Sequence, residues 1–147
     1  MALKEQLNDA MKQAMKAHDS LRLSAVRMIR SAIQNREIDL KRELDDQGVI
    51  EVISSMVKQR RESIRLYQKG NRQDLVEKEN SELDILTGFL PVQLSTAEIG
   101  ELVTQVIRET GVMNIKDMGR IMKALTPLTA GRADGKMVSD IVRKQLS

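Results

Sequence analysis

The sequence of 147 residues contains no cysteine, one histidine and almost no aromatic residues. The lack of cysteine excludes disulfides and thiolate-bound metals. The single histidine, His18, excludes sites that need two imidazoles, and it falls in a turn where no catalytic triad is predicted. Tyr67 and Phe89 are the only aromatic residues, too few for the stacking platforms that bind single-stranded bases. Any contact with nucleic acid must therefore use phosphates and shape, and we expect no catalytic residue, metal or cofactor.

Long apolar runs are also missing. No segment approaches the roughly 18 apolar residues of a membrane span, and no signal-peptide core follows Met1. These absences predict a soluble, cytoplasmic protein with no membrane partner. Glycine and proline are scarce, at eight and two residues, and no alternating strand pattern occurs. The composition therefore favours an all-α fold.

Apolar residues recur at spacings of three and four, which is typical of amphipathic helices. The pattern predicts four helices before Leu90 and three after Leu94, joined by short turns such as Asp45–Gly48. Ser95 and Glu98 have the spacing of a capping box that opens the fifth helix. We predict an antiparallel helical bundle at residues 1–92 and a small three-helix unit at residues 93–147.

The stretch from Met118 to Ser147 carries the excess positive charge. Six basic and two acidic residues give it a net charge of +4, against +3 for the whole chain. Thr126-Pro127 is predicted to end a helix there, because the residue before a proline disfavours the α conformation. Gly131 can adopt a left-handed turn, and Asp134 is placed to cap the last helix.

The turn at residues 131–137, GRADGKM, has some features of a phosphate-binding loop. Its spacing is one residue short of a Walker motif, Met137 replaces the magnesium-binding hydroxyl, and no strand precedes it. Nucleotide hydrolysis is therefore rejected. A helix N-terminus still attracts phosphate, and Arg132 and Lys136 would flank such a site, although Asp134 could itself occupy the anion position. Two cations of the preceding helix could approach the same site: Arg120 and Lys123.

Charge alternates between two predicted helices of the bundle. Residues 58–72 carry a net charge of +5 and residues 74–84 one of −4, which predicts salt bridges between antiparallel neighbours. Arg60 falls within the apolar stripe, so we expect its stem to be packed and its head to pair with an acid. A second basic run lies at residues 22–36.

The last thirty residues resemble the closing motif of the GatB/YqeY family, in which M-G-x-V-M leads to G-R-A-D-G-K-x-V. Further segments similar to the family's pattern occur in the same order upstream, at residues 22–33, 58–63 and 90–95. The resemblance covers nearly the full length. It implies an N-terminal helical subdomain followed by a small C-terminal three-helix unit.

That C-terminal unit is similar to the tail domain of GatB, a subunit of a glutamine-dependent tRNA amidotransferase, in which the tail touches tRNA. The resemblance implies tRNA contacts at Lys123, Gly131, Arg132, Gly135 and Lys136. The family usually has lysines where this chain has Leu128 and Ala130, which makes the loop less basic.

Three hypotheses remain open. The first is a non-catalytic module that binds tRNA or another structured RNA through phosphates. The second is an adaptor that binds an amidotransferase or synthetase complex. The third, which rests on family association alone, is an accessory factor in tRNA-dependent amidation, a carbon–nitrogen ligase reaction with glutamine as amido donor.

Overall fold

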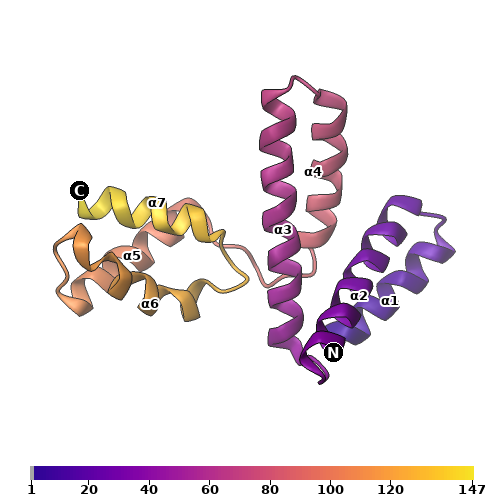
Figure 1. Ribbon diagram of the computed structural model, residues 1–147, viewed down its shortest axis with the longest axis horizontal. Helices are drawn as coiled ribbons and strands as arrows, with labels where there is room; N and C mark the ends of the chain where they lie inside the picture. The colour runs from indigo at the N-terminus through magenta and orange to yellow at the C-terminus, as the bar shows by residue number, and fades with distance from the viewer. Residues whose placement is uncertain (1) are drawn as a thin grey trace. The chain divides into compact units, whose positions relative to one another are not determined.

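The computed structural model describes residues 2–147, and it is all-α, as the apolar spacing predicts. The elements in this part of the chain are α1 (Leu3–Lys16), α2 (Ser20–Leu40), α3 (Asp46–Lys69), α4 (Gln73–Thr87), α5 (Thr96–Thr110), the 3-10 helix η1 (Ile115–Asp117), α6 (Met118–Thr129) and α7 (Gly135–Leu146) (Figure 1). The chain divides into two compact units, one ending at Leu90 and the other running from Pro91 to Ser147. None of the described helices is both long enough and apolar enough to cross a membrane.

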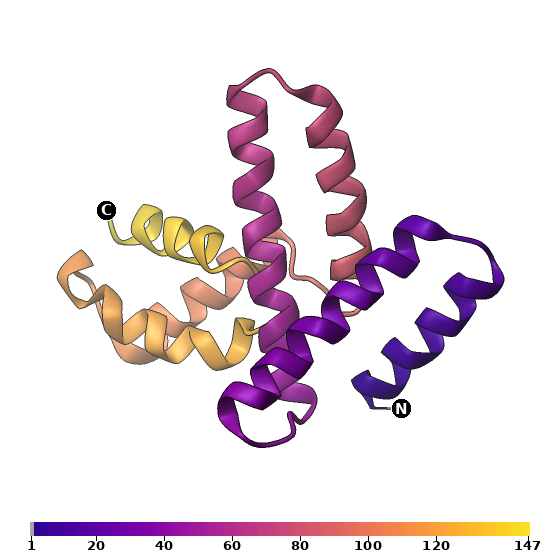
Figure 2. The ribbon, with the colours of Figure 1, turned by 45° about the vertical axis from the view of Figure 1, so that its right-hand side comes forward.

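The first unit consists of two antiparallel hairpins, α1 with α2 and α3 with α4. The hairpins meet near the connection between α2 and α3 and diverge from it, as both ribbon views show (Figures 1 and 2). Their apolar faces share one core, formed by Leu3, Leu7, Ala10, Val26, Ile29, Ile33, Leu44, Val49, Ile53, Val57, Leu86 and Phe89. The guanidinium of Arg22 lies 5.4 Å from the centroid of the Phe89 ring, in a cation–π contact at the edge of this core.

Aspartate caps begin two helices of this unit. Asp19 accepts a hydrogen bond of 3.1 Å from the N–H of Arg22, and Asp45 accepts one of 2.9 Å from the N–H of Gly48. The turn predicted at Asp45–Gly48 is therefore shorter than expected. Because Asp45 satisfies a free N–H of the first turn, α3 already begins at Asp46.

In the second unit, α5, α6 and α7 pack against one another in all three pairs. Their core consists of Ile99, Val103, Val106, Val112, Ile121, Leu125, Val138 and Val142. The predicted capping box is confirmed: Glu98 N–H donates to Ser95 Oγ and Ser95 N–H donates to Glu98 Oε1, each at 3.1 Å. Gly111 ends α5 with a φ of 70°. Asn114 then accepts the N–H of Lys116 at 3.0 Å and caps η1, which leads into α6.

The predicted end of α6 at Thr126-Pro127 is wrong, because the helix continues through Pro127 to Thr129. Pro127 lacks the N–H that would bond to the carbonyl of Lys123, but both residues are exposed, so water can reach that carbonyl. Leu125 and Thr129 are buried on the opposite side, and the Thr129 hydroxyl donates to the Leu125 carbonyl at 3.0 Å. The burial of Leu125 and Thr129 thus outweighs the local tendency of Thr126-Pro127 to end the helix.

Candidate functional site

The turn between α6 and α7 has the predicted form. Gly131 has a φ of 72°, in the left-handed region that favours glycine. The N–H groups of Arg132 and Ala133 both donate to the Thr129 carbonyl, at 2.9 and 3.1 Å. Asp134 caps α7 and accepts the Lys136 N–H at 3.4 Å. These local hydrogen bonds shape the turn and place the N-terminus of α7.

The segment Pro91–Leu94 holds this turn in place. The side-chain amide of Gln93 donates to the Gly131 carbonyl at 2.8 Å and to the Pro91 carbonyl at 2.9 Å. The Leu94 N–H donates to the Arg132 carbonyl at 2.7 Å. The bonds to Gly131 and Arg132 each join residues 38 positions apart in the sequence, and they fix the backbone of two of the predicted site residues.

Arg132 also has structural partners for its side chain. It is half-buried, and its Nε donates to the Val92 carbonyl at 3.4 Å. The pKa of Glu98 is lowered first by the hydrogen bond from the Ser95 backbone, then by the one with the Ser95 side chain, and further by the positive charge of Arg132. The positive charge of Arg132 thus favours the ionised form of Glu98, although the two side chains form no ion pair within residues 2–147.

The other predicted residues of the turn face solvent. Gly135 and Lys136 are exposed in the first turn of α7, and a Cβ on Gly135 would meet no atom within 4 Å. An anion could approach closely here, although Asp134 already occupies one of the N–H groups that would bind it. The structure thus brings four of the six predicted residues together at the turn: Gly131, Arg132, Gly135 and Lys136.

The two remaining residues lie on a helix face and not at the turn. Arg120 and Lys123 are exposed on α6, on the side opposite the buried Ile121, Leu125 and Thr129. Lys123 precedes the end of α6 by six residues, or about 9 Å along the helix axis. The predicted residues therefore form two groups, one at the turn and one on the outer face of α6.

Sequence reasoning missed Lys116, which extends the second group. It lies on η1, four residues before Arg120 and seven before Lys123 in the sequence, and all three side chains are exposed. We call these three residues the α6 basic stripe. None of their side chains has an ion-pair partner within residues 2–147. Gly119 leaves the surface beside them open, since a Cβ there would meet no atom within 4 Å.

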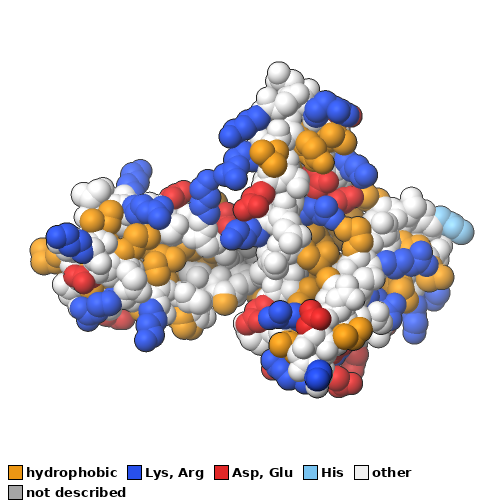
Figure 3. Space-filling model, in the orientation of Figure 1, with side chains coloured by type: hydrophobic (Ala, Val, Ile, Leu, Met, Phe, Trp, Pro, Cys, Tyr) orange, Lys and Arg blue, Asp and Glu red, His pale blue; other side chains and the backbone are white. Residues whose placement is uncertain are grey.

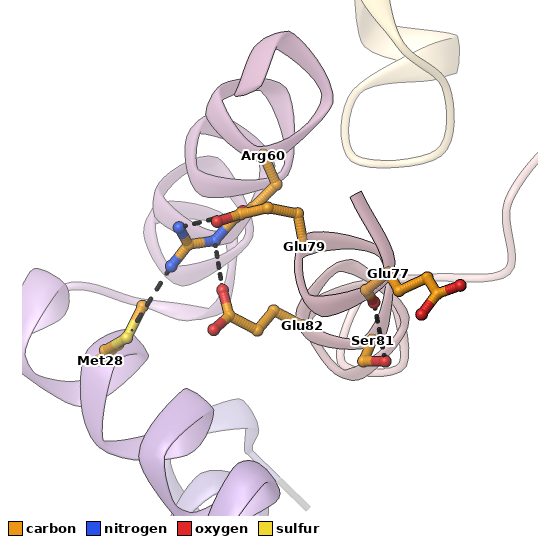
Figure 4. Close-up of polar contacts among 6 residues, drawn as sticks. All are labelled: Met28, Arg60, Glu77, Glu79, Ser81 and Glu82. Carbon is orange, nitrogen blue, oxygen red and sulfur yellow. Dashed lines mark hydrogen bonds and ion pairs between the residues drawn. The ribbon is translucent and has the colours of Figure 1, made fainter. Parts of the chain in front are cut away.

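The predicted pairing of Arg60 in the first unit is confirmed. Its Nη1 lies 3.4 Å from Glu79 Oε2 and its Nε lies 3.3 Å from Glu82 Oε2, both carried by α4 (Figure 4). Its other nitrogen, Nη2, reaches the sulfur of Met28 on α2 at 3.8 Å. Arg60, a half-buried cation of the basic run at residues 58–72, is thus committed to acids of the neighbouring helix. In the described part of the chain, no group of three or more histidine, aspartate or glutamate side chains could hold a metal ion.

The sequence pattern, the fold and the turn agree with one family. Residues 4–146 match the family model described as Yqey-like protein. The chain belongs to the YqeY-like family. This confirms the resemblance inferred from the closing motif.

Three YqeY-like relatives are each named "Altered inheritance of mitochondria protein 41, mitochondrial". The protein of Lachancea thermotolerans is 31% identical over 146 residues, which cover 95% of this chain and 78% of that protein. The protein of Kluyveromyces lactis is 39% identical over 107 residues, 70% of this chain and 57% of that protein. The protein of Vanderwaltozyma polyspora is 32% identical over 120 residues, which cover 76% of this chain and 64% of that protein. In the last two, the match covers less than two thirds of the relative.

These relatives contradict the expectation of a cytoplasmic protein, because their names describe mitochondrial proteins. The absence of a membrane span and of a signal-peptide core, on which that expectation rested, does not distinguish one soluble compartment from another. The names specify neither a ligand nor a reaction.

Proposed function

We propose that this YqeY-like protein is a non-catalytic module that binds structured RNA, tRNA in particular, through backbone phosphates. The observation that carries the proposal is the α6 basic stripe, whose three cations are exposed and lack ion-pair partners within the described chain. Support also comes from the net charge of +4 over residues 118–147 and from the resemblance to the tail domain of a tRNA amidotransferase subunit.

The stripe suits phosphates better than bases. It runs from Lys116 to Lys123, seven positions further along the chain, or about 10 Å along a helix axis, and it carries no aromatic side chain on which a base could stack. Arg120 can bind a phosphate with two nitrogens at once, whereas the lysines act as point charges. Such contacts recognise the shape of a folded RNA and not its sequence.

The turn between α6 and α7 offers a second place for phosphate to bind. Gly135 leaves room for close approach, and Lys136 is exposed beside it. Arg132 supports this arrangement through its hydrogen bond to the Val92 carbonyl, which helps to hold the turn in place for Lys136. In this proposal, the α6 basic stripe makes the main contacts, and the turn adds a smaller one.

The test is tRNA binding by the full chain, measured by fluorescence anisotropy at several salt concentrations. Three phosphate contacts predict a log–log slope of affinity against salt of about −2 to −3. Arg120→Glu combined with Lys123→Glu should weaken binding at low salt by roughly tenfold or more, because two attractive charges become repulsive.

A matched control reverses two exposed lysines of α1, Lys12→Glu with Lys16→Glu, and should leave the affinity for tRNA within about twofold of the parent, because these lysines lie outside the proposed contacts. The pair Arg132→Glu with Lys136→Glu reports on the turn. If neither the α6 pair nor the turn pair weakens binding more than the α1 control does, the proposal is wrong.

A further inference from the structure

A long groove runs between α2 and α3 on the first unit. Its wider part has a volume of about 630 Å³ and its second part about 570 Å³, and the two share the side chains of Ala32, Asn35, Met56 and Gln59. All of the lining residues belong to α2, to α3 or to the connection between these two helices, whose ribbons diverge from that connection (Figure 2).

The groove has an apolar floor. Met28 and Met56 line the wider part, and Leu40 and Val52 line the other. Met28 and Leu40, both on α2, are 37% and 36% exposed, which is high for large apolar side chains in a helical bundle. Hydrophobic side chains are visible in this angle between α2 and α3 (Figure 3). Methionine adapts its shape to a partner, so this floor can pack against varied apolar side chains.

The rim of the groove has a small excess of positive charge, which lies in the wider part, where Arg27 is present without an acid. Arg27, Arg36 and Arg42 line it, are exposed, and have no ion-pair partner among residues 2–147. Two acids, Asp39 and Glu51, line only the second part. The wider part, from Ser20 to Asn35 on α2, therefore presents positive charge and hydroxyl or amide groups around a methionine floor.

Arg60 links the two walls of the groove, which gives that end of the groove some order before a partner binds. Arg60 is held by Glu79 and Glu82 from α4, and it reaches across to Met28 on α2 (Figure 4). A groove whose walls are already ordered loses less conformational entropy when it is occupied.

We propose that this groove binds an acidic amphipathic helix of a partner protein, with the apolar face of that helix on the methionine floor and its acids against the arginine rim. The stretch of α2 from Ser20 to Leu40 is about 30 Å long and accommodates a helix of up to about 20 residues. This inference goes beyond the proposed RNA binding and uses different residues.

A helix fits the groove better than an RNA backbone does. Phosphates gain nothing from the apolar floor formed by Met28, Met56, Leu40 and Val52. A phosphate on this floor would either keep its water or lose it without a hydrogen-bond donor to replace it. The charge of Arg60 is already balanced by two carboxylates. The evenly spaced phosphates of an RNA backbone would also meet Asp39 and Glu51, whereas a helix can carry its acids opposite Arg27 and none opposite these two residues. An apolar face flanked by carboxylates matches both the floor and the rim.

The experiment uses the full chain and three synthetic peptides of equal length. The first is an amphipathic helix with leucine and methionine on one face and glutamates on its flanks. The second has the same composition in scrambled order, and the third carries lysine in place of each glutamate. We expect the acidic helix to bind about tenfold or more tightly than either control peptide, because only it matches both floor and rim. Amide chemical-shift changes should concentrate on α2 and α3.

Two variants localise the binding. Arg27→Glu should lower the affinity for the acidic helix about tenfold and raise the affinity for the lysine peptide, because it reverses one charge of the rim. Arg65→Glu makes the same charge change on an exposed position of α3 outside the groove, and it should leave both affinities unchanged. Met28→Gln, at a partly exposed floor position, should weaken the acidic helix while the protein stays folded.

Each other outcome would overturn the proposal. Equal binding of the acidic and scrambled peptides would mean that the groove recognises charge only. If Arg27→Glu lowers tRNA affinity as much as the α6 pair does, and the acidic helix fails to bind, the groove is an RNA surface. If the chain self-associates and Arg27→Glu abolishes that association, the occupant is a second copy.

Discussion

At the residue scale, the neighbours of a cation decide whether it can bind something else. Arg60 is half-buried, and two carboxylates of α4 take up its charge. Lys123 is exposed and has no ion-pair partner within the described residues. Arg132 lies between these cases, because Val92 and Glu98 engage it only in part. An exposed cation can exchange water for a phosphate, whereas a paired one must first give up its acid.

The intermediate position of Arg132 can be tested through Glu98. Arg132→Gln removes the positive charge but keeps a hydrogen-bond donor, so the lowered pKa of Glu98 should rise part of the way toward its ordinary value. Ser95 continues to lower it, because both Ser95 hydrogen bonds remain. The measurement is an NMR titration of the Glu98 carboxyl carbon, with Arg132→Lys as the charge-preserving control. An unchanged pKa in Arg132→Gln would show that Arg132 is free of Glu98 in solution.

The lowered pKa of Glu98 also makes the stability of the fold depend on pH. A carboxyl whose pKa is lower in the folded than in the unfolded chain stabilises the fold above its unfolded pKa, and this contribution is lost as the pH falls through the folded pKa. The Arg132→Gln variant, with a smaller shift at Glu98, should therefore lose less stability on acidification than the parent does.

At the element scale, helix starts could be predicted from the sequence and one helix end could not. Ser95 and Glu98 cap α5, and Asp134 caps α7, because each acts on backbone N–H groups two or three residues away. The end of α6 depends instead on burial of Leu125 and Thr129 against helices distant in sequence. Local rules contain no information about that burial, and so they place the end of the helix too early.

A substitution of the proline inside α6 measures how much its local preference costs the helix. Pro127→Ala should raise the free energy of unfolding by about 1 kcal/mol, because the restored N–H can bond to the Lys123 carbonyl and the gain outweighs the added freedom of the unfolded chain. Urea unfolding monitored by circular dichroism checks this. Ala124→Gly, at an exposed position of the same helix, is the control and should lower stability by about 1 kcal/mol. A loss of stability in Pro127→Ala would indicate that the proline ends the helix in solution.

The candidate site shows the same division between local and distant causes. The turn at Gly131 and the cap at Asp134 follow from the residue types alone, and the structure has both. The attachment of that turn to Gln93 and Leu94 joins segments far apart in the sequence, and no local pattern signals it. Lys116 could have been found, because its spacing from Arg120 and Lys123 is helical.

At the scale of the whole molecule, each unit has its own core. The buried cluster of the first unit involves only residues up to Phe89, and that of the second begins at Ile99. A domain with its own core can fold alone when its ends are cut outside its internal contacts. The bonds from Gln93 and Leu94 to the turn at Gly131 and Arg132 place the necessary start of the second unit before residue 93.

This reasoning predicts a difference between two fragments of the second unit. The fragment 91–147 should fold cooperatively, whereas 95–147, which keeps the Ser95–Glu98 capping box but loses Val92, Gln93 and Leu94, should be less stable by roughly 3 kcal/mol. That figure corresponds to three lost hydrogen bonds to the turn at about 1 kcal/mol each. Urea unfolding of both fragments measures the difference, and Gln93→Ala in the longer fragment should reproduce about a third of it. Equal stability of the two fragments would show that the turn needs no support from Pro91–Leu94, and Arg132 would then be as available to phosphate as Lys136.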